Sequence, residues 1–396
     1  MAKRLPVLIA GGGIGGLSTA IALGRADFET SVLERSAFTE ESGAGIQLGP
    51  NATRILRALG VLDLLMPQAF RPEAVWVFDG LTGRKLATVP LGDRAEQRYG
   101  APYLTFHRAD LHAGLREAAE AGSTVSLSSG FDVARIEDTH RDGATGKITV
   151  TDSEGSTLRG SALVGADGLW STVRKWIAPD ASLSFTGATA FRTLLPLSDV
   201  PAPFTAPIVG LWLGPNAHLV HYPVRAGEAL NVVAVTETGQ RGEGWNQEAD
   251  RSALLAAFTR WCSDSKSLLE RGDKWRAWSL FSLNAVPHWS RGAVTLLGDA
   301  AHPVLPYLAQ GAGLAIEDAA TLAQGMRSSR DNPAAAFEAF EAARRPRARR
   351  LQQTAQRFGR AYHMGGPFRL VRNTALALRS KRDALRRFDW LYGQEV

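Results

Sequence analysis

A glycine-rich run directly behind a short apolar segment constrains the fold of this chain most. Residues 5–10 (Leu-Pro-Val-Leu-Ile-Ala) predict a buried strand, and residues 11–16 (Gly-Gly-Gly-Ile-Gly-Gly) follow with the spacing G-x-G-x-x-G. A helix is predicted over 14–25 and a second strand over 30–34. Glycines let backbone N–H groups approach a pyrophosphate, and the helix N-terminus favours its negative charge. The unit therefore predicts a dinucleotide site, without identifying the dinucleotide.

An acidic residue completes this unit. Glu34 ends the second strand 18 residues after Gly16, where a carboxylate can accept hydrogen bonds from ribose hydroxyls. A glycine-rich structural turn is the alternative interpretation of the loop. The predicted contact residues of the unit are Gly11, Gly13, Ile14, Gly16, Glu34 and Arg35.

Two later turns each carry an aspartate behind a predicted strand. Asp167 stands in Gly-Ala-Asp-Gly, and Asp299 stands in Gly-Asp-Ala-Ala-His-Pro. An aspartate in such a turn can bind sugar or ribityl hydroxyls. A helix that opens near Gly311 and Ala312 would direct its positive end toward the loop. We expect all four residues to contact the cofactor.

The three motifs, in this order and spacing, resemble those of the single-component flavoprotein aromatic hydroxylases, over nearly the whole chain. The resemblance implies that FAD occupies the three loops. Residues 43–51 resemble the flavin-contacting loop of the family and include Gln47, and Arg108 matches an arginine that lies against the FAD. The closing run 388–393 is similar to the salicylate hydroxylase and 3-hydroxybenzoate 6-hydroxylase branch.

The predicted fold class is α/β plus β: a Rossmann-like FAD-binding domain, an inserted β-sheet substrate domain and a C-terminal helical region. Residues 74–90 predict a β-hairpin, and the stretch from about 186 to 240 is mainly strand-like. Helices are predicted over 51–66, 108–121, 249–262, 311–326 and 333–362. The expected boundaries are 1–67, 106–185 and 285–330 for the FAD-binding domain, 68–105 and 186–284 for the substrate domain, and 331–396 for the helical region.

Two residues of one predicted strand are the candidate catalytic pair. His218 and Tyr222 are four residues apart, so their side chains share one face of a strand, and His221 falls on the other. In the branch that the chain resembles, a histidine and a tyrosine at this spacing face the aromatic substrate. Such a pair can help to remove a phenol proton. A structural histidine beside a core tyrosine is the alternative.

Other candidates surround the expected substrate. Some members of the branch place a polar side chain over the ring just after the Gly-Asp motif, where this chain has Pro306 and Tyr307. Proline cannot supply that group, so the substitution pattern of the substrate stays open, and Tyr307 or Gln47 could compensate. Arg192 could bind an anionic substrate or be a structural arginine. His302 could act on the substrate or pack beside the flavin loop.

Charge and cysteine content exclude several classes. Residues 341–396 hold 14 Lys/Arg against 4 Asp/Glu, which can indicate nucleic acid or membrane binding, although a solvated helical face is the favoured interpretation. The single cysteine, Cys262, excludes an intrachain disulfide and a cysteine metal site, and we expect it to be a buried small hydrophobe. No carboxylate or third histidine stands at ligand spacing near His218 and His221, so no metal is expected.

Motif searches narrow the localisation and the chemistry further. The first ten residues superficially resemble a signal peptide, but the apolar run ends at glycines as a strand entering a nucleotide loop does, so we expect a cytoplasmic protein. No run of about 18 apolar residues predicts a membrane span. Neither a G-x-S-x-G elbow nor a G-x-x-x-x-G-K-[ST] loop occurs.

Together the residues and the resemblance predict an FAD-dependent monooxygenase. It would hydroxylate a small phenolic, carboxylated aromatic with NADH or NADPH and O₂, through a hydroperoxide of the flavin. NAD(P)H would bind without a second dinucleotide domain, since one fingerprint is present. We expect a monomer or homodimer without nucleic-acid or membrane partners. The alternatives are a related FAD oxidoreductase that does not hydroxylate and a non-catalytic flavin- or nucleic-acid-binding protein.

Overall fold

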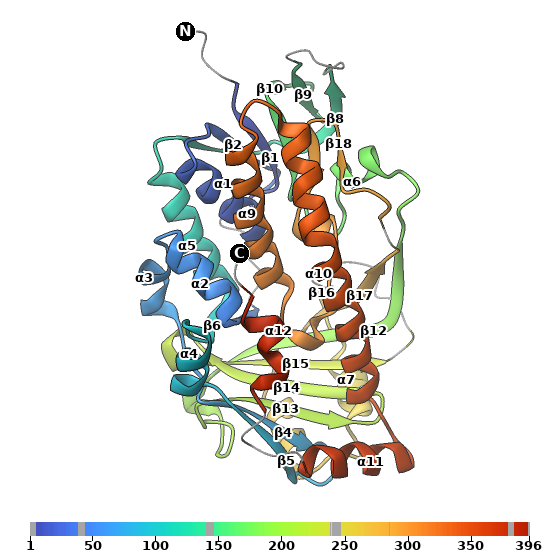
Figure 1. Ribbon diagram of the computed structural model, residues 1–396. Coiled ribbons are helices and arrows are strands. Elements are labelled where there is room, and N and C mark those ends of the chain that lie inside the picture. Colours follow the sequence, from blue (N-terminus) through green and yellow to red (C-terminus); the bar gives the residue numbers. More distant parts are fainter. Residues whose placement is uncertain are drawn as a thin grey trace.

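Two large sheets, one above the other, organise the molecule (Figure 1). The computed structural model describes residues 5–38, 44–139, 146–237, 239, 247–284, 286–378 and 384–394. Gly43, the first residue of the expected flavin-contacting loop, and Ala285, the expected start of a domain segment, lie outside the described residues. Within the described part, no helix has the length and apolar character needed to cross a membrane.

The upper sheet has six strands in the order β18-β19-β11-β1-β2-β7, and all neighbours except β18 and β19 run parallel. Its central strands are apolar and buried on both faces, which is typical of a parallel sheet covered by helices. α1 packs between α9 and α5. The strands are β1 Val7–Ala10, β2 Thr30–Glu34, β7 Val125–Ser129, β11 Ala162–Gly165, β18 Ser290–Arg291 and β19 Val294–Leu296, and the helices are α1 Ile14–Arg25, α5 Arg108–Glu120 and α9 Gly311–Ser328.

The lower sheet has eight strands in the order β16-β17-β12-β15-β14-β13-β4-β5. The predicted hairpin over 74–90 joins it through a parallel pair between β4 and β13. One face packs on an aromatic core that includes Trp212, Phe258 and Trp275. The strands are β4 Ala74–Asp79, β5 Lys85–Pro90, β12 Leu183–Pro196, β13 Ile208–Gly214, β14 Ala217–Val224, β15 Ala229–Glu237, β16 Gln247–Glu248 and β17 Arg276–Leu283.

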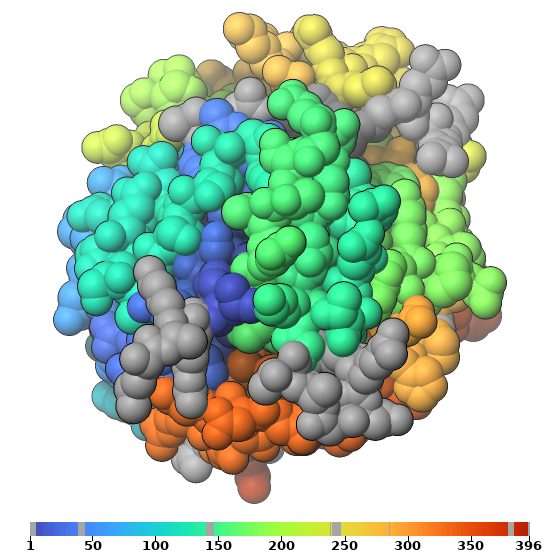
Figure 2. All heavy atoms as spheres, turned by 90° about the horizontal axis from the view of Figure 1, so that it is seen from above, coloured from blue at the N-terminus to red at the C-terminus, as the bar shows by residue number. Residues whose placement is uncertain are grey.

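Two small sheets complete the strands. β8 Val133–Asp138, β9 Ile148–Asp152 and β10 Thr157–Gly160 form one of them at the N-terminal end of the molecule (Figure 1). Seen from above, the teal and green atoms of this region lie beside the dark blue atoms of the first described residues (Figure 2). β3 Gly45–Leu48 pairs antiparallel with β6 Leu104–His107, which brings the loop around Gln47 to the start of α5.

A long C-terminal helix connects the two sheets. α10 Pro333–Tyr362 begins at Asn332, whose side chain accepts a hydrogen bond from the Ala335 amide, and it continues past Pro346. It descends from the upper sheet to the lower one (Figure 1). α11 Gly366–Ala377, η7 Arg386–Phe388 and α12 Asp389–Tyr392 follow it, and η5 Pro306–Leu308 lies against it.

Two predicted helices differ in the structure. The helix expected over 51–66 is divided into α2 Pro50–Ala58 and α3 Leu62–Leu65, because Gly60 adopts a φ of +61° and ends the first helix. The helix expected over 249–262 is only α7 Arg251–Ala257, followed by α8 Ser263–Glu270. Cys262 precedes α8 as its N-cap and is only partly buried, so its prediction as a buried residue is wrong. The remaining helices are α4 Gly92–Tyr99 and α6 Thr172–Ile177.

Candidate active site

The three motif loops meet at one edge of the upper sheet. β1, β11 and β19 are parallel neighbours, and the registers pair Ala10 with Gly165 and Gly165 with Leu296. The loops that leave the carboxyl ends of these strands therefore start side by side. The carboxyl edge of an open parallel sheet is where such folds bind their ligands.

The first loop combines two tight contacts with one open position. Gly11 has a φ of +99°, and a Cβ there would lie 2.4 Å from the Ala166 carbonyl oxygen. A Cβ on Gly16 would lie 1.9 Å from the Gly11 carbonyl oxygen. By contrast, a Cβ on Gly13 would meet no atom within 4 Å, and Gly13 starts α1 without a side-chain cap. The first N–H groups of α1 therefore face open space that suits a phosphate.

Glu34 is engaged by the chain itself. One carboxylate oxygen accepts a hydrogen bond from the Gly12 amide at 2.7 Å, and the other accepts from the Ser36 amide at 3.0 Å. The side chain therefore fixes the glycine loop. Arg35 beside it is exposed. Contact of either residue with ribose stays a prediction.

The second loop is ordered by its own aspartate. The Asp167 carboxylate accepts from the Ser171 hydroxyl at 2.5 Å and from the Val173 amide at 3.0 Å, so it caps α6. Burial raises the pKa of Asp167, and these hydrogen bonds oppose the shift. Arg174 of α6 donates to the Ala300 carbonyl at 2.9 Å and ties this loop to the third. The binding of sugar hydroxyls by Asp167 stays a prediction.

The third loop presents a carboxylate without a hydrogen-bond donor among the described residues. Asp299 follows Gly298, which has a φ of +61°, and its side chain is exposed to open space. Protein surrounds it on the other sides, and this desolvation raises the pKa of Asp299, while the charges of His302, Arg108 and Arg174 lower it. An aspartate placed in this way is ready to accept hydrogen bonds from a ligand.

The helix behind the third loop is also open at its start. α9 begins at Gly311 with no side-chain cap and no acidic residue in its first turn. A Cβ on Gly311 would meet nothing within 4 Å. Two uncapped helix N-termini and the open carboxylate of Asp299 thus surround the same edge of the sheet, and these residues fit FAD.

His302 belongs to a buried ionic cluster. Its Nε2 lies 2.6 Å from an oxygen of Asp318, which also accepts from Arg344 at 2.6 Å. All three residues are buried. The structure therefore places His302 as the packing interpretation expects.

The candidate catalytic pair lies on the lower sheet, on the face opposite the aromatic core. His218 and Tyr222 belong to β14 and are both buried. Arg192 of β12 and Val220 of β14 both pair with Val233 of β15, and directly opposed residues share a face. The side chains of His218, Tyr222 and Arg192 are therefore on the same side of the sheet.

Tyr222 is connected to the flavin-loop candidate Gln47. Burial raises the pKa of Tyr222 to about 12, and the charge of Arg192 and a hydrogen bond with Gln47 oppose the rise. Gln47 also accepts a hydrogen bond from the Tyr103 hydroxyl at 2.7 Å. This pair brings the middle of the sheet face close to β3.

Arg192 is a partly buried cation without an acidic partner in the described part of the chain. Its Nε has no hydrogen-bond partner there, and its guanidinium lies 5.1 Å from the ring centre of Trp278. Burial lowers the pKa of Arg192, the neighbouring Tyr222 opposes this shift, and the charge of Arg108 adds to it. A partly buried cation of this kind is costly unless an anion binds beside it.

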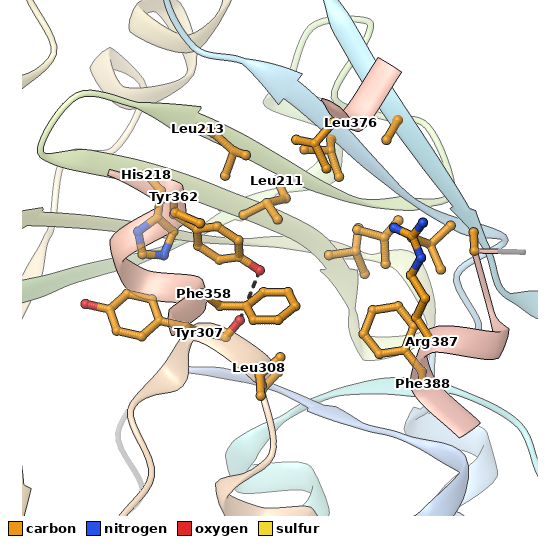
Figure 3. A pocket seen from close by; sticks show the side chains of 18 of the residues that line it. Leu211, Leu213, His218, Tyr307, Leu308, Phe358, Tyr362, Leu376, Arg387 and Phe388 are labelled. Atoms are coloured by element: carbon orange, nitrogen blue, oxygen red, sulfur yellow. Dashed lines mark hydrogen bonds between the residues drawn. The ribbon is translucent and has the colours of Figure 1, made fainter. Parts of the chain in front are cut away.

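A cavity of about 740 Å³ opens in front of this sheet face. His218 lies in it beside the rings of Tyr307 and Tyr362, while Phe388 and Arg387 border the other end (Figure 3). The walls are mainly apolar. Four predicted residues line the cavity, namely Gln47, His218, Pro306 and Tyr307, whereas Tyr222 and Arg192 are not among its lining residues.

His221 points to the other face, as expected. Its ring packs at 5.0 Å from Phe204 and 6.4 Å from Trp212. Burial lowers the pKa of His221 to about 3, so this histidine is neutral. Among the described residues, no group of three or more His, Cys, Asp or Glu side chains could hold a metal ion.

His363, which contacts His218, and Glu237, which contacts His363, were not predicted from the sequence. His363, just after α10, lies 2.8 Å from His218, and Glu237 at the end of β15 lies 2.6 Å from His363. His218 and His363 are 145 residues apart in the sequence. The only local signal was a Tyr-His pair at the end of a basic helix, which does not identify a partner.

A three-loop dinucleotide site facing a sheet with a histidine, a tyrosine and a partly buried arginine defines a class of flavoprotein. The family described as FAD binding domain matches residues 4–355, and the chain belongs to it. The 3-hydroxybenzoate 6-hydroxylase of Polaromonas naphthalenivorans (strain CJ2) is 38% identical over 99% of this chain and 96% of that protein. A 3-amino-4-hydroxybenzoate 2-monooxygenase, PtnB3 of Streptomyces platensis, is 36% identical over 99% and 97%.

A solved structure agrees with this assignment at the level of the fold. A salicylate hydroxylase substrate complex superposes with a TM-score of 0.82 at 24% identity, over 100% of this chain and 97% of that one. The family resemblance and the α/β class predicted from the sequence are confirmed. The protein is an FAD-dependent aromatic monooxygenase, and its class uses NAD(P)H and O₂.

Proposed function

We propose that this protein hydroxylates a small phenolic aromatic carboxylate of the hydroxybenzoate type. In this proposal residues 68–105 and 186–284 form the substrate domain, and residues 1–67, 106–185 and 285–330 hold FAD. Residues 331–396 form the helical region that closes the cavity. The relatives named for 3-hydroxybenzoate and 3-amino-4-hydroxybenzoate support this substrate class. A cytoplasmic location and a monomeric or homodimeric state remain predictions from the sequence.

The observation that carries the proposal is the unpaired cation on the sheet face. The Nε of Arg192 is buried, and neither of the titratable groups beside it, Tyr222 and Arg108, is a carboxylate. A planar carboxylate can bind a guanidinium through two parallel hydrogen bonds, which offsets the desolvation. An aromatic carboxylate would also lie against Trp278, which already contacts the guanidinium. A neutral aromatic would leave the cation unpaired.

The same face provides a base for the phenol. His218 is buried and its pKa is lowered well below the ordinary value, mainly by burial and also by His363, so its ring is neutral and can accept a proton. A phenolate is a more electron-rich ring than a phenol. We assign proton removal to His218 and orientation of the phenolic oxygen to Tyr222, whose hydroxyl stays protonated because its pKa is about 12.

FAD, when bound, takes electrons from NAD(P)H and activates O₂ for transfer to the ring. The residues of this chain that would hold it are the open Gly13 at the start of α1, in the loop that Gly11 and Gly16 shape, together with Asp299, Arg108 and the start of α9 at Gly311 and Ala312. Positive potential from the α9 N-terminus favours a negatively charged flavin ring. The apolar cavity walls exclude water from the reacting atoms.

Pro306 and Tyr307 bound the ring site on the side of the third loop. The Tyr307 ring centre lies 5.4 Å from that of His218, and both line the cavity. Burial raises the pKa of Tyr307 to about 12, so its hydroxyl stays a hydrogen-bond donor. We propose that Tyr307 supplies the polar contact that Pro306 cannot, and that it restricts which ring carbon faces the flavin.

A substrate panel and one substitution test this proposal. The wild-type protein should oxidise NAD(P)H faster with hydroxybenzoates than with phenol and should incorporate oxygen-18 from O₂ into the product. Arg192→Gln should weaken binding of the hydroxybenzoate by about 30-fold or more, since loss of a buried charge pair costs at least 2 kcal/mol. Binding is measured by titration of the flavin absorbance.

The binding of phenol itself serves as the control, because phenol has no carboxylate and should bind both proteins equally. Arg192→Lys should recover only part of the affinity, since an ammonium cannot form the bidentate pair. Equal hydroxybenzoate affinity in wild type and Arg192→Gln would remove Arg192 from the site. NAD(P)H oxidation without oxygen-18 in any product would favour the non-hydroxylating alternative.

A further inference from the structure

The proposed base belongs to a three-membered chain that leads out of the cavity. His218 Nδ1 lies 2.8 Å from His363 Nε2, and His363 Nδ1 lies 2.6 Å from a carboxylate oxygen of Glu237. His218 is 3% exposed and His363 is 6% exposed, whereas the Glu237 side chain is 48% exposed. The hydrogen-bonded groups thus run from a buried imidazole to the protein surface.

Asn216, in the turn between β13 and β14, holds the backbone of the residues that form this hydrogen-bonded relay. The Asn216 amide donates to the His363 carbonyl at 3.1 Å, and the Asn216 carbonyl accepts from the Glu237 amide at 2.9 Å. Asn216 itself adopts a φ of +55° and precedes His218 by two residues. The three side chains are therefore held by rigid strand and helix ends, which favours a constant alignment.

The hydrogen bonds also determine which nitrogen carries each proton. A carboxylate only accepts, so His363 Nδ1–H donates to Glu237. The Nε2 of a neutral His363 then has a lone pair and accepts from His218 Nδ1–H. The remaining nitrogen, Nε2 of His218, is left as an acceptor on a ring that lines the cavity, and no described residue donates to it. The substrate's phenol can approach this atom.

Resting on the proposed function above, we propose that His363 and Glu237 are positioning residues that relay the phenol proton from His218 to water. The phenol O–H bond breaks as His218 Nε2 takes the proton, and Nδ1–H of His218 passes to His363 Nε2. Nδ1–H of His363 then passes to Glu237, which releases the proton to solvent. The reverse passage returns a proton to the oxygen of the product and restores both original tautomers.

Burial makes such an exit necessary. A charged His218 would have no carboxylate beside it, because the groups facing it are the rings of Tyr307 and Tyr362 and the imidazole of His363. Burial lowers the pKa of His363 as well, and Glu237 raises it while Arg372 lowers it. A proton held on His218 would therefore be costly, and Glu237 is the first group in the chain that solvent reaches.

Proton release on ligand binding tests the relay without turnover. FAD-loaded protein without NAD(P)H is mixed in a stopped-flow instrument with 3-hydroxybenzoate, or with phenol, in weakly buffered phenol red. The wild type should release a proton as the phenolate absorbance appears. Glu237→Gln and His363→Gln should slow this release by about 10-fold or more, because an amide cannot transfer the proton. Glu237→Asp should recover part of the rate.

The matched control is Glu228→Gln, an exposed glutamate at the other end of β15. It should release the proton at the wild-type rate. The dissociation constant of the ligand, the FAD content and the unfolding temperature should be unchanged in Glu237→Gln. A merely structural role for Glu237 would alter those three quantities and leave the rate of proton release at the wild-type value, and that result would overturn the relay.

The outcomes separate the relay from the proposed function. Hydroxylation of hydroxybenzoates together with wild-type proton release in Glu237→Gln overturns the relay and leaves the function standing. Glu237-dependent proton release with phenol, but no preference for carboxylated rings, supports the relay and overturns the carboxylate assignment. No proton release from the wild type with either ligand overturns the relay and the assignment of proton removal to His218.

Discussion

Gly13 and Gly16 are three residues apart in one loop, yet a methyl group should affect them very differently. The Cβ of an alanine at 16 would overlap the carbonyl oxygen of Gly11, the residue that directly follows β1. At position 13 the methyl group would extend into the open space in front of α1. One position therefore reports on folding and the other on cofactor binding.

We expect Gly16→Ala to lower the free energy of unfolding of the apoprotein by about 3 kcal/mol, the upper range for overpacking a tight contact. Gly13→Ala should leave the stability of the apoprotein unchanged, because Gly13 has an ordinary φ of −74°. It should weaken FAD binding by about 10-fold or more, equivalent to 1.4 kcal/mol. Thermal unfolding of the apoprotein and the flavin absorbance of purified protein measure the two effects.

Wild-type flavin occupancy and affinity in Gly13→Ala would contradict the assignment of the first loop to the phosphates. Unchanged stability of Gly16→Ala would contradict the close contact with Gly11.

The loop glycines could be predicted from the sequence because their conformational role depends on residues nearby in the chain. The glycine spacing and the two aspartates describe turns that follow strands, so the sequence located the three loops that meet at the sheet edge without knowledge of distant contacts. Arg192 is different. Its charge was visible, but the lack of an acidic neighbour on strands β14 and β15 depends on a register that only the folded sheet defines.

α11 is attached to the lower sheet by one buried carboxylate. Arg369 donates two hydrogen bonds of 2.8 Å to Asp79 at the end of β4, and Asn373 donates a third. Asp79 is 1% exposed. Burial raises the pKa of Asp79, but the hydrogen bonds from Arg369, the Thr82 amide and Asn373 outweigh it and lower the pKa to about 2. The ionised form is therefore favoured in the folded state.

This attachment predicts a defined acid dependence. Because the folded pKa of Asp79 is about 2 and its ordinary value is 3.8, its contribution is complete above pH 4 and is lost as the pH falls toward 2. Asp79→Asn should lower the free energy of unfolding by roughly 2 kcal/mol at neutral pH, with the difference from wild type vanishing near pH 2. Urea unfolding at a series of pH values measures this.

The control is Asp93→Asn, an exposed carboxylate paired with Arg71, which should change stability by less than about 1 kcal/mol at any pH. A constant difference between wild type and Asp79→Asn from pH 7 to pH 2 would show that the carboxylate charge is not what holds α11.

The C-terminal helices show what the sequence could and could not predict for an element. The helix predicted over most of 333–362 is α10 Pro333–Tyr362, whose start carries Asn332 as N-cap and Pro333 in the first turn. Its basic residues were interpreted as a solvated face, which is wrong for Arg344 and Arg347, since both are buried. Charge and helix period are visible in the sequence, whereas the acids that pair with these arginines come from another helix.

At the scale of the whole molecule, a buried ionic cluster joins the flavin loops to the C-terminus. Arg344 and Arg347 of α10 pair with Glu317 and Asp318 of α9. Glu317 also accepts from Asn51 of α2 at 2.6 Å. Arg347 further donates to the backbone carbonyls of Trp390 and Leu391, at 3.0 and 2.9 Å. The buried charged side chains of the cluster therefore stabilise one another.

We expect Arg344→Met to lower the free energy of unfolding by about 3–5 kcal/mol, because it leaves two buried carboxylates with fewer partners. The loss should be similar at low and high salt, since buried pairs are screened little. Urea unfolding at two salt concentrations measures it. Arg71→Met, which removes an exposed pair with Asp93 and Glu96, should cost less than about 1 kcal/mol and serves as the control.

Equal losses in the two variants would mean that the cluster contributes no more than a surface pair. The sequence shows the Glu, Asp and Arg residues of the ionic cluster at scattered positions. It does not show that α2, α9, α10 and α12 bring them together. The side chains of Asn51, Glu317 and Arg347 and the backbone carbonyl of Trp390 come together only in the folded chain.

The path of α10 limits how this enzyme can be recombined with its relatives. The helix begins beside the end of α9, away from the three motif loops, and its last turns, with Phe358 and Tyr362, form a wall of the cavity opposite the lower sheet. In a chimera that takes only the lower-sheet strands from another hydroxylase, the end of α10 that covers the cavity would still come from this protein. Exchange of substrate specificity therefore requires a crossover upstream of Phe358, so that the lower sheet and the end of α10 come from the same parent protein.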